Sequence, residues 1–124
     1  MNKIKFLGIW MDHSNAFLME LYDHKITSKS IIKPIQKEED NMDNHEIQMH
    51  SKEESQHQAA FFKEISDVIR NYKNVLLFGP TDAKNELYNL LKVDHRFEDT
   101  KFELRNTDKM TENEMNQFVV AYFR

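Results

Sequence analysis

The chain lacks cysteine and is poor in glycine and proline, with two of each among its 124 residues. Without cysteine it has no thiol nucleophile, thiolate metal ligand or disulfide, a usage typical of the reducing cytoplasm. The two glycines, Gly8 and Gly79, are far apart, which excludes a glycine-rich loop for nucleotide phosphates. No stretch approaches the roughly 20 apolar residues of a membrane span, and no signal-peptide pattern opens the chain. We therefore expect a cytoplasmic protein with no membrane partner.

The chain also has no excess of positive charge, since its net charge at pH 7 is -4. Residues 36–57 contain seven acids and two lysines, a net charge of -5, which leaves +1 for the rest of the chain. Nonspecific binding to nucleic acid needs clustered lysine and arginine side chains that neutralise phosphates. A nearly neutral body therefore argues against a DNA partner, and RNA would require a local basic patch.

A strand, a turn and a helix follow one another in the most informative part of the sequence. The apolar run at residues 75–78 is typical of a buried strand. Gly79 permits an unusual backbone angle and Pro80 cannot donate to a central ladder, so together they end the strand. Thr81 or Asp82 can cap the helix that follows. This order is the first half of a β-α-β crossover, in which ligands gather at the carboxyl ends of strands.

Apolar patterning extends this to a complete α/β fold within one domain, residues 1–124. Strands are predicted at 4–11, 16–22, 25–35, 75–78 and 100–106, and helices start near Ser51, Asp82 and Thr111. The order β-β-β-α-β-α-β-α favours a single mixed β-sheet with helices packed on both faces, whose last two strands are parallel. Ser51 with Glu54 and Thr111 with Glu114 fit capping boxes. Residues 36–50 lack apolar periodicity and are predicted to be a mobile acidic loop.

Polar residues suggest several sites, each with a structural explanation. An anion at the turn before the second helix would meet the charge of Asp82, so we interpret that turn as structural. His45, His50 and His57 are spaced by five and seven residues, and not by the i,i+4 spacing that brings two metal ligands together on one helix face. We interpret them as solvated, and we expect no metal and no cofactor. The sequence Asp12-His13-Ser14 is turn chemistry, because adjacent residues do not form a catalytic triad by sequence order alone.

Three blocks of sequence carry a resemblance to a known family. They are Ile9-Trp10-Met11-Asp12-His13-Ser14 with Ala16; Phe78-Gly79-Pro80 with Ala83-Lys84 and Glu86; and Asn106-Thr107-Asp108 with Thr111, Gln117 and Ala121-Tyr122-Phe123. With these blocks the chain resembles the bacterial translational machinery proteins, relatives of domains of archaeal and eukaryotic peptide-chain release factors and of pelota. The resemblance implies an α/β sandwich that acts at or near the ribosome, and it brings no catalytic residues.

Two departures from the family limit what the resemblance implies. Release factors hydrolyse peptidyl-tRNA with a Gly-Gly-Gln loop, and the separate Gly8 and Gly79 cannot supply one. The family usually has glycine at the third position of the strand-to-helix turn, where this chain has Thr81. That departure weakens the case for an anion site built from backbone amides.

The first hypothesis is a non-enzymatic binding protein of the translation system. It would contact ribosomal RNA, a ribosomal protein or a translation factor in rescue, hibernation or regulation. The predicted contact residues are Asp12, His13, Ser14, Gly79, Pro80, Thr81, Lys84, Thr107 and Asp108, with Lys84 as the main charged anchor. A second hypothesis is a small hydrolase or nuclease that uses Asp12, His13 and Asp108, with or without a divalent metal. A third is a structural homodimer that buries the hairpin face or a sheet edge.

Overall fold

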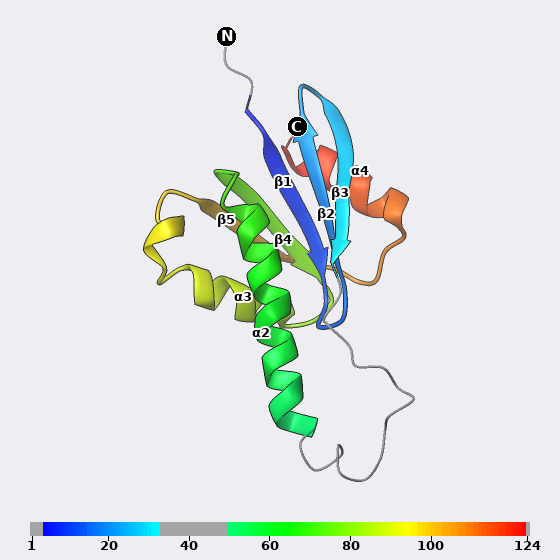
Figure 1. Ribbon diagram of the computed structural model, residues 1–124. Helices are drawn as coiled ribbons and strands as arrows, with labels where there is room; N and C mark the ends of the chain where they lie inside the picture. Colours follow the sequence, from blue (N-terminus) through cyan, green and yellow to red (C-terminus); the bar gives the residue numbers. More distant parts are fainter. Residues whose placement is uncertain (1–3, 33–49, 124) are drawn as a thin grey trace.

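The computed structural model describes residues 4–32 and 50–123, which form one five-stranded sheet with helices on both faces (Figure 1). The elements are β1 (Phe6–Met11), β2 (Ala16–Tyr22), β3 (Lys25–Ile32), α2 (His50–Ile69), β4 (Asn74–Gly79), α3 (Ala83–Leu91), the 3-10 helix η2 (His95–Phe97), β5 (Lys101–Asn106) and α4 (Glu112–Phe123). The strand order is β3-β2-β1-β4-β5. The predicted α/β class and mixed sheet are therefore confirmed.

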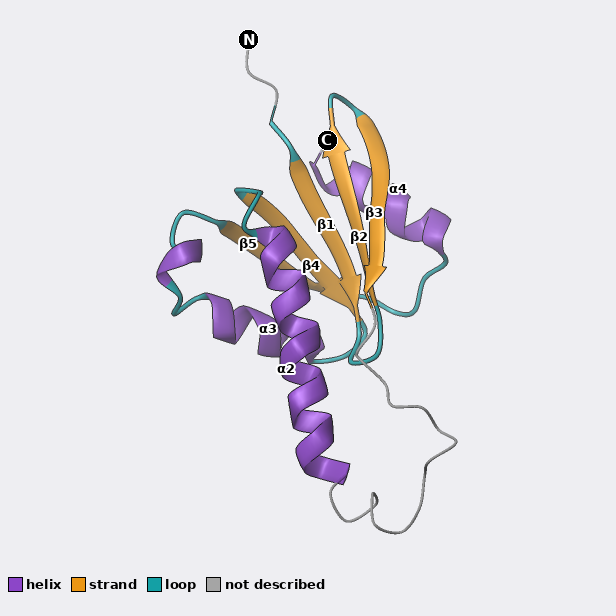
Figure 2. Cartoon of the chain, viewed as in Figure 1, coloured by secondary structure: helices purple, strands orange, loops and turns teal. Residues whose placement is uncertain are grey.

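The direction of the strands follows from how they are connected. Tight turns join β1 to β2 and β2 to β3, and both pairs are antiparallel. Helical crossovers lead into β4 and β5, so β4 is parallel to β1 and β5 is parallel to β4. Helices α2 and α3 cover one face of the sheet and α4 covers the other (Figure 2). No helix among the described residues is long and apolar enough to cross a bilayer.

The central strands β1 and β4 are buried on both faces because successive side chains point to opposite sides. In β1, Leu7 and Ile9 pack in the cluster beneath α2 and α3, while Trp10 packs in the cluster beneath α4. Trp10 is buried there, with 5% of its surface exposed. A Cβ atom on Gly8 would lie 2.3 Å from a methyl group of Val119, so α4 packs directly against the backbone of β1.

The ends of the elements follow local chemistry. Asp23 and His24 have positive φ angles of 53° and 66°, as the two central residues of a tight hairpin turn require. The predicted capping box of α4 is confirmed, since the Thr111 N–H donates to Glu114 Oε1 at 2.8 Å and the Glu114 N–H donates to Thr111 Oγ1 at 3.2 Å. The sequence did not predict η2, which Asp94 begins by accepting a hydrogen bond from the N–H of Arg96.

Some predicted features fall outside the described residues. These are the last part of the third strand, at 33–35, the acidic loop at 36–49, and the side chains of Ser51, Glu54, His45, His50 and His57. His50 begins α2, so the helix starts one residue before the predicted cap.

Candidate functional site at the carboxyl edge of the sheet

Parallel pairing of β1, β4 and β5 brings three distant segments to one edge of the sheet. These strands end at Met11, Gly79 and Asn106, and the register places the three ends side by side. Residues 12–15, 79–84 and 106–108 lie at these ends or directly after them. We call the three segments together the carboxyl-edge surface. All nine residues predicted from sequence lie in these segments. The structure thus brings the predicted residues together, and their binding role stays a prediction.

The segment after β1 is a turn closed by an aspartate. Asp12 Oδ1 accepts hydrogen bonds from the N–H groups of Ser14 at 2.8 Å and of Asn15 at 2.7 Å. The Asp12 N–H in turn donates to the carbonyl of Asn15 at 3.0 Å. His13 and Ser14 are left exposed at the tip. One oxygen of the Asp12 carboxylate therefore maintains the loop that presents these two side chains.

Gly79 contacts the ends of both neighbouring strands, and its position leaves no room for a side chain. Its φ is +150°, and an added Cβ would lie 2.1 Å from the carbonyl oxygen of Met11 at the end of β1. On its other side, the Gly79 carbonyl accepts a hydrogen bond from the Thr107 N–H at 3.1 Å. The buried hydroxyl of Thr107 has no hydrogen-bond partner among the residues that the structure describes. The sequence prediction of an unusual backbone angle at this glycine is confirmed.

The start of α3 follows the exposed Pro80 and depends on Thr81. Thr81 Oγ1 accepts a hydrogen bond from the Ala83 N–H at 3.2 Å. Asp82 occupies the N-cap position but makes no capping hydrogen bond with its side chain, and its Oδ1 accepts from Asn85 Nδ2 at 3.2 Å instead. Of the two caps that the sequence allowed, Thr81 therefore supplies the hydrogen bond. The exposed carboxylate of Asp82 makes this helix terminus unfavourable for an anion.

Lys84 corrects a prediction, because its side chain is buried and not presented to a partner. It is 1% exposed, and among the described side chains it is the one charged group in the core. Its Nζ donates to the carbonyl of Thr81 at 2.8 Å, one turn back along the chain. Desolvation lowers the pKa of Lys84 below its ordinary value, and the nearby negative charge of Asp82 partly opposes this effect. Sequence alone does not reveal this burial, because a lysine in the first turn of a helix is normally solvated.

A contact that the sequence analysis missed joins β1 to α3 across the surface. His13 Nε2 lies 3.1 Å from Glu86 Oε2, with about half of each side chain exposed. Glu86 was absent from the predicted site because 73 residues separate it from His13. The parallel pairing of β1 with β4 brings them together. Nothing in the sequence around either residue indicates this contact, because each is an ordinary polar residue within its own segment.

The surface is acidic. Asp82 and Asp108 are exposed, Asp12 is half-buried, and the one lysine within the three segments, Lys84, has its charge in the core. Two exposed charges border the surface, Glu86 after one segment and Lys109 after another. The described residues contain no group of three or more His, Asp or Glu side chains that could hold a metal ion. Asp12, His13 and Asp108 therefore do not form such a group within the part of the chain that the structure describes.

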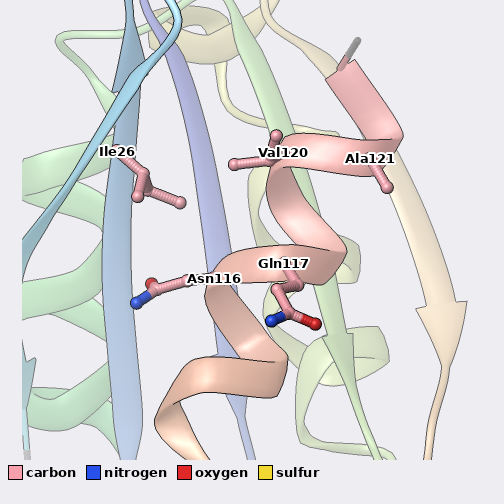
Figure 3. A pocket seen from close by; sticks show the side chains of 5 residues that line it. All are labelled: Ile26, Asn116, Gln117, Val120 and Ala121. Carbon is pink, nitrogen blue, oxygen red and sulfur yellow. The ribbon is translucent and has the colours of Figure 1, made fainter.

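A separate hollow of about 470 Å³ lies between α4 and β3 (Figure 3). Its lining consists of Ile26, Asn116, Gln117, Val120 and Ala121. Ile26 and Asn116 point toward each other across it. Its lining contains none of the nine predicted contact residues and no titratable side chain, so it offers no acid-base chemistry.

Comparison with solved structures shows the same fold in translation factors. Pelota from Archaeoglobus fulgidus matches 95% of this chain with a TM-score of 0.62 at 13% identity. The archaeal translation termination factor aRF1 matches 96% with a TM-score of 0.60 at 16% identity. Saccharomyces cerevisiae Dom34, described as a translation termination-like factor in RNA quality control pathways that interacts with Hbs1, matches 92% with a TM-score of 0.57 at 12% identity.

This chain covers 31%, 39% and 31% of those three proteins, respectively, so it spans about a third of their length. No protein-family model matches the chain, and no curated protein sequence matches it. The likeness is thus one of fold to a part of pelota-like and release-factor-like proteins.

Proposed function

We propose that this chain is a non-enzymatic binding module of the translation system, used in rescue, hibernation or regulation. The observation that carries the proposal is the convergence of residues 12–15, 79–84 and 106–108 at one exposed edge of the sheet. In α/β sheets this edge is where ligands and partners bind. The fold shared with pelota, aRF1 and Dom34 supports translation as the setting.

The charges of the surface favour a basic protein as the partner over ribosomal RNA. Phosphate contacts need exposed lysine or arginine, and the one lysine of this surface is buried. The exposed carboxylates of Asp82 and Asp108, with that of Glu86 at the border of the surface, complement a positive surface instead. A ribosomal protein or a translation factor with a basic face has that property.

Peptide release is not part of this proposal. Release factors use adjacent glycines for that reaction, whereas here Gly8 lies in the core of β1 and Gly79 lies against the backbone of Met11. Neither glycine is in a loop that extends from the fold. The role we propose for the carboxyl-edge surface is therefore binding and not peptide release.

Ribosome co-sedimentation tests the proposal. Tagged wild-type protein is expected in ribosomal fractions of a gradient, with binding that weakens as salt is raised. The double variant Glu86→Lys, Asp108→Lys reverses one exposed charge within the surface, at Asp108, and one at its border, at Glu86. It should bind roughly tenfold more weakly or worse, since like charges at an interface oppose association.

A matched control uses the opposite edge of the sheet. Glu98→Lys with Asp99→Lys changes the net charge by the same amount, and Glu98 also contacts a histidine, with its Oε1 3.4 Å from His95 Nδ1. This control should co-sediment like the wild type. Wild-type protein found free in both growing and starved cells would refute the proposal, and equal losses in both double variants would refute the assigned surface. Tighter binding to protein-free ribosomal RNA than to ribosomal proteins would refute the basic protein partner.

A further inference from the structure

Strand β5 is an edge of the sheet, and half of its backbone faces away from the molecule. Among the strands that the structure describes, β4 alone pairs with it. The N–H groups of Lys101 and Thr107 donate toward the β4 side, to Lys73 O at 2.8 Å and to Gly79 O at 3.1 Å. Backbone direction alternates along a strand, so the odd-numbered residues of β5 face β4 and the even-numbered residues face outward.

The exposed face of β5 carries charges in alternating order. Lys101, Glu103 and Arg105 are exposed on the α4 side of the sheet. Arg105 Nη1 donates to Glu103 Oε1 at 2.9 Å, and its guanidinium lies 5.2 Å from the centre of the Tyr122 ring in α4. Arg105 is thus held beside Glu103 at the edge of the sheet, and each of these two charged side chains is about half exposed.

We propose that two copies of this chain pair antiparallel through β5, with Leu104 of each copy at the two-fold axis. In this register the outward-facing Leu104 opposes its symmetry mate and Phe102 opposes Asn106, which allows about six backbone hydrogen bonds between the copies. Glu103 of each copy then lies opposite Arg105 of the other, twice by symmetry. The two five-stranded sheets become one continuous sheet of ten strands.

The side-chain charges of β5 and the direction of its backbone N–H and C=O groups favour the same registers for pairing between two copies. A pairing centred on Glu103 or Arg105 would bring like charges together, and its central residues have their N–H and C=O groups turned toward β4. A pairing centred on Phe102 would match Lys101 with Glu103, but it would extend past the start of β5 to Thr100. The Leu104 register is therefore the one that matches both charges and strand length.

The other edge of the sheet does not offer this complementarity. The sequence of β3 contains two lysines and no acid, so self-pairing there offers no pair of opposite charges in any register. Its pairing with β2 also contains a bulge at Leu18 and Met19, and bulges and lysines are common protections of edge strands. The second copy is thus expected on β5.

Sedimentation velocity on the purified full chain over a concentration series tests the pairing. The wild type should show a concentration-dependent shift from monomer to dimer. Glu103→Arg and Arg105→Glu should each weaken dimerisation roughly tenfold or more, because each places like charges opposite one another twice. An equimolar mixture of the two variants should dimerise again, since every opposed pair is then of opposite charge. The double variant E103R/R105E should restore the homodimer.

Lys101→Glu separates the two complementary registers. It should leave the dimer unchanged in the Leu104 register, where position 101 faces Thr107, and weaken it in the Phe102 register. Circular dichroism and thermal melting verify that each variant is folded, which is expected for side chains this exposed. A wild-type monomer up to roughly 1 mM, where even weak association becomes visible, would overturn the proposal. So would a dimer that neither charge reversal affects, or a mixture that does not dimerise.

Discussion

At the residue scale, Lys84 places an ammonium in the core with the Thr81 carbonyl as its hydrogen-bond acceptor. A buried charge with incomplete pairing is often replaced by an apolar side chain of similar size without loss of stability. We expect the free energy of unfolding of Lys84→Met at pH 7 to equal that of the wild type or to exceed it by up to about 1 kcal/mol. Lys84→Ala, which leaves a cavity, should lose about 2 kcal/mol or more. Chemical denaturation of the three proteins measures this.

The difference in free energy of unfolding between the wild type and Lys84→Met should change with pH in a defined direction. The pKa of Lys84 in the folded state lies below the value of 10.5 that applies to the unfolded chain. Between those two values the unfolded chain binds a proton that the folded chain does not, so the free energy of unfolding rises with pH. The wild type should therefore gain stability relative to Lys84→Met as the pH rises toward 10.5 through this window. A difference that stays constant between pH 7 and 10.5 would show that the ammonium is not desolvated.

At the scale of elements, the contact of α4 with β1 depends on Gly8 being without a side chain. Gly8→Ala would place a Cβ against Val119 and should destabilise the fold by about 1–3 kcal/mol, as overpacked cores do. Val119→Ala alone leaves a cavity, but in the double variant the smaller side chain makes room for the new methyl group. Denaturation of both single variants and the double variant should therefore give a favourable coupling energy of about 1 kcal/mol.

Leu87 supplies the control for this cycle. It lies in the cluster on the opposite face of the sheet, so Leu87→Ala combined with Gly8→Ala should be additive within about 0.5 kcal/mol. If Gly8→Ala were also additive with Val119→Ala, this would mean that α4 as a whole moves away from β1. The proposed close contact would then not determine the packing of α4.

The elements themselves could be predicted from sequence because their signals are local. The apolar run of β4, the glycine that ends it and the Thr111–Glu114 capping box all lie within a few residues, and all three are confirmed. The helix η2 was missed because three residues give too little apolar periodicity to detect. Lys84 was misjudged because burial of a side chain depends on which elements pack around it, which local sequence does not state.

At the scale of the whole molecule, the site is made by topology. The sequence placed residues 79–84 and 106–108 at strand ends, and the connection between β4 and β5 predicted that they share an edge. Placement of the turn at residues 12–15 beside them required the parallel pairing of β1 with β4 across the first helix. The contact of His13 with Glu86 follows from that pairing and has no local signature.

Hydrogen exchange should show the same hierarchy across the sheet. Amides of β1 and β4 have bonded strands on both sides and buried side chains on both faces, so Ile9 and Leu77 should exchange only through global unfolding. In β5, the N–H of Glu103 faces β4, whereas the N–H of Leu104 faces outward at the open edge. Leu104 should therefore exchange much faster than Glu103 in dilute solution, as residue-resolved exchange by NMR would measure.

Raising the protein concentration distinguishes an open edge from a paired one. If two copies pair through β5, the outward amides of Phe102, Leu104 and Asn106 gain hydrogen bonds and their exchange slows with concentration. Amides of Glu103 and Arg105, already bonded to β4, should change less. Ile9, which exchanges through global unfolding, should slow only by the general gain in stability that dimerisation brings. Equal slowing at all six positions would indicate a general gain in stability without new hydrogen bonds at β5. Slow exchange of Leu104 in dilute protein would mean that another part of the chain already covers this edge.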